Sequence, residues 1–451
     1  MALTTRSFKL DLYLEHIEEA AFLYEQCIAL RRQADFAWRR LEDFEARLEA
    51  HLDALVIGGP LALELCERRA HEGEPGEVFA AVSVFCRHQR ATEFGRSLRA
   101  LTEAEQAHRD ALAAALAREL PPGWVEHCGS ALQRHEPALQ QTLLDVTALR
   151  RLPLSASILT APLGEHAGCC SAAARALARL RDPASQPLLT KLAGHASPQV
   201  RIEALAGLLA LGAPEALAQA GTYALQEPRA LILLSLAAGP GALDILLTAL
   251  QQASTSGTAA LALGLFGDLR AVRPLLNALR NEVLAAHAAW ALYLITGAPL
   301  FGEEFVPEPM EADERFSHET HAVQEHGAAD DRGDGRPFGT RQRLLSRSVA
   351  AWNDWLGANA ARFEAGRRYR LGRLAGPASV LETLSEPQLP DSVRQAAAEE
   401  ARIRYDCDLP FESSLPVRHQ VRALRGLARW LEQHQARFNA GRWYFAGREL
   451  P

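Results

Sequence analysis

The chain has 451 residues, 48% of them hydrophobic, so it is long enough to bury an extensive core and to divide into roughly two or three domains. A net charge of −7 argues against a general affinity for nucleic acid, because phosphate binding needs a basic surface. No stretch approaches the roughly 18 consecutive apolar residues of a membrane helix, and residues 1–14 lack the apolar centre of a signal peptide, so we expect a cytoplasmic protein without membrane insertion.

The first segment, residues 1–164, has the pattern of an irregular series of helices. One apolar face at helical spacing consists of Leu12, Leu14, Ile17, Ala21 and Tyr24. Glycine and proline clusters such as Gly58-Gly59-Pro60 separate the helices. We expect this helical N-terminal region to cap the repeat array that follows it.

Residues 165–300 carry a repeat. Turn-forming residues recur at Asp182, Gly212, Gly239 and Gly267, at spacings of 30, 27 and 28 residues, each between two apolar runs. A period in this range is typical of stacked helix pairs, in which each pair needs its neighbours to complete a core. The sequence therefore predicts an all-α fold, a solenoid of helical repeats.

Residues 301–337 differ in composition from the rest of the chain. Between Glu303 and Asp334 there are eleven acidic residues and two arginines, with almost no apolar periodicity, which predicts a flexible acidic insertion. His318, His321 and His326 lie in it. Their spacing is not that of H-E-x-x-H, and an unordered backbone does not position ligands, so we predict no metal site there.

Residues 338–451 contain a duplication, because ARFEAGRRYRLGR (361–373) is followed by ARFNAGRWYFAGR (436–448) seventy-five positions later. A helix with a tryptophan precedes each copy, and each tail has a tyrosine that can fold back onto this helix. The likeness of LYLITGAPLF (292–301) to IRYDCDLPF (403–411) extends the duplication upstream. We predict a tryptophan-helix module in two copies, about 338–375 and 396–450, that closes the end of the solenoid.

The segment AALALGLFGDLRAVRPLLNALRN (259–281) resembles the HEAT repeats of the phycobilisome-lyase-like type. The stretches EEAAFLYEQ (18–26), EAHLDAL (49–55) and GEPGEVFAA (73–81) are similar to an uncharacterised family of bacterial HEAT-repeat proteins. The resemblance implies a HEAT-like solenoid, an α-α superhelix. Genes of this family often lie in type VI secretion clusters, so it also implies a role beside a secretion effector or spike protein.

The sequence contains no G-x-S-x-G, Walker, Rossmann or H-E-x-x-H motif. Its seven cysteines include no C-x-x-C pair, so no zinc site is spelled out and we expect no cofactor. We expect a non-catalytic scaffold or adaptor that binds a protein partner, in the resemblance's terms an adaptor or chaperone for a type VI secretion effector or spike. The alternatives are a lyase-type enzyme that acts on a small molecule or protein and a purely structural assembly component.

The candidate partner-binding residues lie in two places. Arg273, Asn277 and Arg280 belong to the second helix of the fourth repeat unit and the residues after it. Arg442, Trp443 and Arg448 belong to the second aromatic tail, and Trp and Arg are frequent at interface hot spots. The counterpart of Trp443 in the first tail is Arg368, which is not normally buried alone, so we expect this position to face solvent. The sequence leaves the oligomeric state open.

Overall fold

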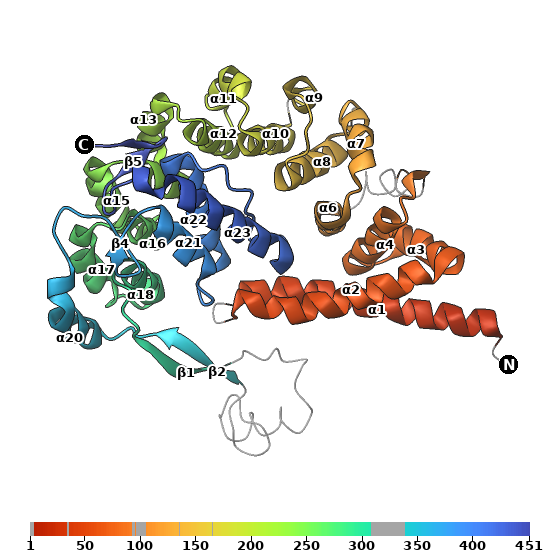
Figure 1. Cartoon of the computed structure of the whole chain (residues 1–451), viewed down its shortest axis with the longest axis horizontal. Coiled ribbons are helices and arrows are strands. Elements are labelled where there is room, and N and C mark those ends of the chain that lie inside the picture. The colour runs from red at the N-terminus through yellow and green to blue at the C-terminus, as the bar shows by residue number, and fades with distance from the viewer. Residues whose placement is uncertain are drawn as a thin grey trace, which may run out of the picture.

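The computed structural model describes residues 4–33, 36–92, 95, 105–134, 136–164, 166–307 and 339–451. Helices dominate these residues, and the strands among them are short, so the predicted all-α HEAT-like solenoid is confirmed (Figure 1). No helix within these ranges is long and apolar enough to cross a membrane. Most of the predicted acidic insertion, with its three histidines, lies outside the described residues.

The helices before residue 165 are α1 (Thr5–Arg32), α2 (Leu41–Ile57), α3 (Gly59–Glu72), α4 (Pro75–Arg87), α6 (Gln106–Glu119), α7 (Val125–Leu132), α8 (Pro137–Arg150) and α9 (Ala156–Thr160). Helices α1 and α2 pack side by side as a long hairpin. Each contributes apolar side chains to the core, such as Leu23 of α1 and Leu52 of α2, which are fully buried. The N-terminal end of α1 projects beyond its neighbours (Figure 1), and Phe8 there is 58% exposed.

The array continues with α10 (Ala167–Leu180), α11 (Gln186–Leu192), α12 (Pro198–Ala210), α13 (Pro214–Tyr223), α14 (Pro228–Ala237), α15 (Leu243–Leu250), α16 (Ser256–Phe266), α17 (Val272–Ala278) and α18 (Glu282–Thr296). Even-numbered helices pack on one another as an inner row, and the odd-numbered helices form an outer row. Small side chains allow this close packing: a Cβ at Gly264 would lie 2.7 Å from the Cα of Ala291. The alternation already starts at α6, so the array begins before residue 165.

The predicted turn residues end the inner helices. Asp182 and Asp268 each accept a hydrogen bond from the backbone N–H two residues later, at the start of the short 3-10 turns that precede α11 and α17. Gly267 has a φ of 79°, a conformation that favours glycine. A Cβ at Gly267 would also collide with the backbone oxygen of Tyr369, so this glycine makes room for the first aromatic tail.

The beginning of the predicted insertion belongs to a β-hairpin. Strands β1 (Phe301–Pro307) and β2 (Gly339–Leu345) pair antiparallel, with Phe301 opposite Leu345. The Phe301 ring lies 6.2 Å from Trp290 and 5.1 Å from Tyr293 of α18, which holds the hairpin against the array. The sequence assigned residues 301–307 to a flexible insertion, and the structure corrects this assignment because Phe301 is anchored by aromatic packing.

The remaining elements are α20 (Val349–Asn359), β3 (Tyr369–Arg370), β4 (Arg373–Leu374), α21 (Pro377–Ser385), α22 (Asp391–Tyr405), α23 (Val417–His434), β5 (Tyr444–Phe445) and β6 (Arg448–Glu449). Each tail tyrosine packs edge-on against a phenylalanine after the tryptophan helix, with ring centroids 5.1 Å apart in both Tyr369–Phe363 and Tyr444–Phe438. The predicted fold-back of the two tyrosines is therefore confirmed.

Each tail hairpin caps the C-terminal end of a helix. The N–H groups of Leu371 and Gly372 donate to carbonyls at the end of α18, and those of Ala446 and Gly447 donate to the equivalent carbonyls of α22. Helices α18 and α22 are thus the first helices of the two copies. The upstream extension of the duplication, predicted from residues 292–301 and 403–411, matches this arrangement.

The second copy lies inside the curve of the array (Figure 1), where α22 packs against the inner helices α12 and α14. Buried arginines make the connection. Arg368 donates to the carbonyls of Leu265 and Phe266 at the end of α16, and Arg404 donates to two carbonyls at the end of α14. Because helix C-termini carry unpaired carbonyls and a partial negative charge, these guanidinium groups stabilise them.

Glu400 on α22 completes this network. Its carboxylate lies 2.5 Å from Arg368, 2.9 Å from Arg370 and 3.8 Å from Arg404, and all four side chains are at most 1% exposed. Burial acts to raise the pKa of Glu400, but the guanidinium charges outweigh it and lower the pKa to about 2. This network and the packing of α22 hold the second copy against the inner row of the array. Solenoids commonly bind their partners on this concave face, and here the chain itself covers it.

The prediction that Trp443 faces solvent is wrong. Trp443 is 4% exposed and packs against Phe266, with ring centroids 5.9 Å apart. Its counterpart Arg368 is fully buried as well, because helix carbonyls and Glu400 satisfy its guanidinium group. The sequence rule failed because it assumed that a buried arginine would have no partner.

The 3-10 turn Trp38–Arg40 before α2 contacts the C-terminal region, and this contact closes a ring of helices (Figure 1). Trp38 in this turn is 3% exposed, and the guanidinium of Arg394 on α22 lies 3.9 Å from its ring centroid. Glu45 on α2 accepts a hydrogen bond of 2.9 Å from the N–H of Val417 at the start of α23. We call this contact the ring closure.

Candidate partner-binding groove

The predicted partner-binding residues occupy two sets of positions. Arg273, Asn277 and Arg280 are exposed on α17 and just after it. In the second set Arg442, just before β5, and Arg448 on β6 are exposed, whereas Trp443 is buried. Within the described residues no hydrogen bond or ion pair joins one set to the other.

Helix α23 carries a row of arginines that we call the arginine stripe. Arg418, Arg422, Arg425 and Arg429 recur at i, i+4, i+7 and i+11, so they share one face of the helix, and all four are exposed. Arg418 pairs with Glu49 of α2 at 3.0 Å. The other three arginines form no ion pair with any residue that the structure describes.

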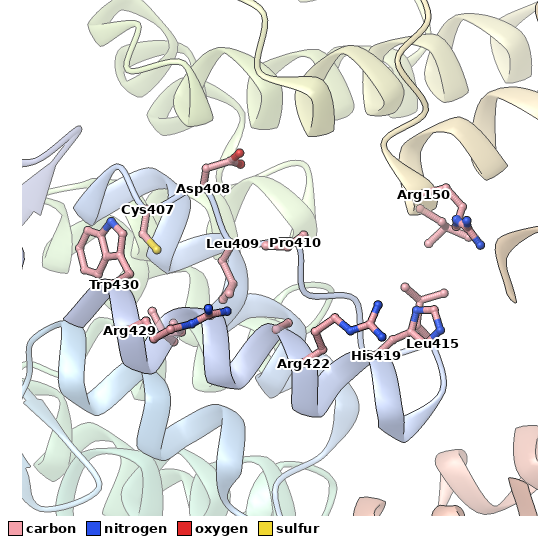
Figure 2. A pocket seen from close by; sticks show the side chains of 14 residues that line it. Arg150, Cys407, Asp408, Leu409, Pro410, Leu415, His419, Arg422, Arg429 and Trp430 are labelled. Atoms are coloured by element: carbon pink, nitrogen blue, oxygen red, sulfur yellow. The ribbon is translucent and has the colours of Figure 1, made fainter. Parts of the chain in front are cut away.

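A groove of about 420 Å³ runs beside the arginine stripe, between α23, the loop 407–410 and the end of α8 (Figure 2). Arg422 and Arg429 extend from α23 along the groove, and Arg150 reaches it from α8. The apolar part of the lining comes from Leu149, Leu409, Pro410, Leu415, Leu427 and Trp430. The groove therefore combines cationic side chains with an apolar lining, and the carboxylate in its lining, Asp408, pairs with Arg151 at 2.6 Å.

The charges around the groove favour an anion. Burial and the guanidinium groups of Arg418, Arg150 and Arg422 lower the pKa of His419 to about 4. Arg150 donates to the backbone oxygen of Ala117 at 3.2 Å rather than to a carboxylate, so its positive charge is not cancelled by a hydrogen-bonded acid. A carboxylate that entered the groove would offset this accumulation of positive charge.

Gly426 lines the groove in the interior of α23. Glycine at such a position costs about 1 kcal/mol relative to alanine. A Cβ at Gly426 would meet no heavy atom within 4 Å, so packing inside the protein does not require glycine. The glycine instead leaves this part of the α23 surface open, so that another molecule can approach the helix backbone closely.

Comparison with the first copy shows which residues of this surface the fold of the module does not require. Helices α20 and α23 end in the same 3-10 turn, 360–362 and 435–437, so their positions correspond at a separation of 75 residues. The correspondence pairs Arg425 with Ala350, Gly426 with Ala351 and Arg429 with Asp354. Arg418 and Arg422 pair with Arg343 and Arg347 at the same separation, so only Arg425, Gly426 and Arg429 are specific to the second copy, and the fold of the module does not require them.

A second cavity, of about 300 Å³, lies between α1, α6, α8 and residues 414–416. Several of its charged side chains are paired with each other or with neighbours, for example Arg175 with Asp145 at 2.6 Å and Arg31 with Glu45 at 3.1 Å. Its positive charges are therefore less available to an anion than those of the groove.

Chemically reactive groups are scarce around the groove. Among the described residues no cluster of three or more His, Cys, Asp or Glu side chains could hold a metal ion. Cys407 contributes to the lining, but burial raises the pKa of its thiol to about 12, so this thiol is not an effective nucleophile at neutral pH.

Sequence reasoning missed Arg422, Arg425, Gly426 and Arg429. Their spacing on one helix face is readable in the sequence, and a glycine inside a helix is a second signal. The apolar lining was not readable, because Leu149 and the loop 407–410 are far apart along the chain and meet only in the folded protein.

Comparison with known proteins identifies the repeats. A family model, the PBS lyase HEAT-like repeat, matches residues 170–195 and 257–281. These matches coincide with the helix pairs α10–α11 and α16–α17. No curated protein matches the chain. The matches support a HEAT-repeat protein, and repeats of this kind are generally protein-interaction modules.

Proposed function

We propose that the protein is a non-catalytic scaffold that binds an acidic segment of a protein partner in the groove beside the arginine stripe. The proposal is carried by Arg422, Arg425 and Arg429, whose guanidinium groups are exposed beside an apolar groove without a carboxylate partner among the described residues. Carboxylates bind guanidinium groups in a directional, bidentate way. An apolar side chain in the groove would add affinity by leaving water.

An acidic peptide fits this surface better than a nucleic acid. The protein carries a net charge of −7, which opposes a general attraction to phosphates. Trp430 stacks on His434, with centroids 4.8 Å apart and ring planes at 13°, so one face of the indole is already covered and not free for a base. Pro410, which is exposed, and Leu149, which is half-buried, offer an apolar contact that a peptide side chain can use.

The position of the groove agrees with the filled concave face. In a solenoid whose inner row were open, a partner would lie along the inner helices. Here α22 packs on this row, and α23 with its arginine stripe lies farther inside the curve of the array (Figure 1). The C-terminal copy thus takes the place that the inner row has in an open array.

The family resemblance supports a more specific role. In this role the protein is an adaptor or chaperone in the cytoplasm that holds a type VI secretion effector or spike protein through the groove. The lyase-type alternative has no support from the groove, where the lining thiol of Cys407 is buried. The purely structural alternative differs only in that the partner is never released.

The test is affinity capture in the native host with three forms of the protein: wild type, Arg422→Glu/Arg429→Glu, and the matched control Arg273→Glu/Arg280→Glu. All four substitutions are at exposed positions, so the melting temperature should stay within a few degrees of wild type. We expect one stoichiometric partner that the control retains and the groove variant loses. Retention of this partner by the groove variant, or its loss from the control, contradicts the proposal.

A further inference from the structure

We infer that the acidic segment is an α-helix that crosses α23 at Gly426, with carboxylates on the arginine stripe and one apolar side chain in the groove. The inference rests on the function proposed above and specifies the structure of the partner's segment. Three observations carry it: the spacing of the arginines, the glycine at the crossing point and the apolar lining beside it.

The spacing of the arginine stripe matches a helix. Arg418 already pairs with Glu49, so the comparison uses the other three arginines. At 1.5 Å per residue, the intervals of three and four residues between Arg422, Arg425 and Arg429 correspond to about 4.5 and 6 Å along the axis of α23. In a helix with glutamates at i, i+4, i+7 and i+11, the last three present carboxylates at the same intervals, whereas an extended chain repeats its side chains on one face about every 6.8 Å and falls out of register by about 3 Å.

Gly426 provides the space for a close crossing. Two helices approach to about 8–10 Å between axes, and the side chains at the contact decide where in this range they settle. The residue has no internal neighbour within 4 Å of its Cβ position, so the free space lies on the groove side of α23. In the first copy Ala351 stands at the equivalent position, and Ala350 and Asp354 replace two of the arginines while Arg343 and Arg347 match the other two, so the first copy lacks the space at this position and half of the positive charge.

The apolar lining gives the helix a fixed register. The half-buried Leu149 and the buried Leu415 and Leu427 line the same groove as Gly426. A large apolar side chain on the partner helix, placed next to its acidic face, would enter between them as an anchor. The acidic face alone would bind weakly, since exposed ion pairs contribute little free energy.

Fluorescence anisotropy with designed peptides tests the inference. The first probe is a stapled acidic helix with glutamates at i, i+4, i+7 and i+11 and one leucine on the adjacent face. The second probe has the same composition with a central proline and no staple, which prevents a continuous helix. A third replaces the glutamates with glutamine, and a fourth replaces the leucine with serine. Inorganic polyphosphate serves as a competing anion.

Two variants locate the site. Gly426→Leu places a side chain at the crossing point and, because leucine is a better helix former than glycine, leaves α23 intact. Arg425→Ala/Gly426→Ala/Arg429→Asp installs the residues of the first copy, in which the same module folds. Equal or higher melting temperatures for both variants show that they are folded.

We expect the stapled acidic helix to bind wild type at least about tenfold more tightly than the proline, glutamine and serine probes, and each variant to lose about tenfold in affinity. Equal binding of the helical and proline probes overturns the helix but leaves an acidic segment as the ligand. Failure of every acidic peptide to bind, or tighter binding of polyphosphate, overturns both the inference and the proposed function. Full binding by Gly426→Leu overturns the crossing point.

Discussion

Replacing Glu400 with glutamine removes the carboxylate that three buried arginines share. Arg368, Arg370 and Arg404 would keep their hydrogen bonds to helix carbonyls but lose the negative charge between them. This substitution tests whether the network holds the C-terminal region against the inner row of the array.

The structure sets the size of the effect. A pKa lowered from 4.5 to about 2 corresponds to about 3 kcal/mol in favour of the ionised carboxylate in the folded protein. Removing one partner of a buried ion pair typically costs about 3–5 kcal/mol. We therefore expect Glu400→Gln to reduce the free energy of unfolding by about 3 kcal/mol at neutral pH. Glu432→Gln, the same change at an exposed position of α23, should stay within about 0.5 kcal/mol.

The pH dependence follows from the direction of the pKa shift. Because the pKa of Glu400 is lowered in the folded state, its contribution is complete above the unfolded value of about 4.5 and is lost as the pH falls towards 2. The difference between wild type and Glu400→Gln should therefore shrink below about pH 4.5. Urea unfolding at a series of pH values measures it. A loss below about 1 kcal/mol at pH 7, or a difference that does not change with pH, refutes the reasoning.

Three further predictions follow. Trp443→Ala should cost about 3–5 kcal/mol because the ring is buried against Phe266, whereas Arg442→Ala should cost less than about 0.5 kcal/mol; similar melting curves for the two would contradict the packing. Trp38→Ala should weaken the ring closure and speed hydrogen exchange of the Val417 N–H, and unchanged exchange would refute this role for Trp38. The ring of His419 should titrate near pH 4 in the free protein and at a higher pH with an acidic peptide bound. The reason is that a nearby carboxylate stabilises the imidazolium, which Arg118, Arg150, Arg418 and Arg422 destabilise. If NMR shows the same titration with and without the peptide, the peptide binds elsewhere.

Much of the fold could be predicted because its signals are local. Asp268 and Gly267 mark a turn through their own backbone preferences, and a strong echo such as residues 361–373 and 436–448 requires two similar modules. The place of the second module could not be predicted, because it depends on buried arginines that meet helix ends far away in the sequence. Trp443 was misplaced for this reason, since its counterpart Arg368 has partners that only the folded chain provides.

Only part of the groove could be predicted from the sequence. The arginine stripe of α23 is a local pattern, but four arginines on an exposed helix face are also what an ordinary solvated helix shows. What distinguishes them is the contrast with α20, the missing carboxylate partners among the described residues and the apolar lining from α8 and the loop 407–410. These features are tertiary, so sequence reasoning favoured the residues of α17 and the aromatic tail instead.

Site-specific photocrosslinking tests the central claim most directly. A photoreactive phenylalanine analogue at position 425 sits on the arginine stripe, and the same analogue at position 277 sits on the outer helix α17; both positions are exposed. Irradiation in the native host should give one partner adduct from position 425, with the crosslinked partner peptide rich in Asp and Glu, and none from position 277. An adduct from position 277 alone, or a crosslinked peptide from position 425 without acidic residues, would contradict the binding of an acidic partner at this groove.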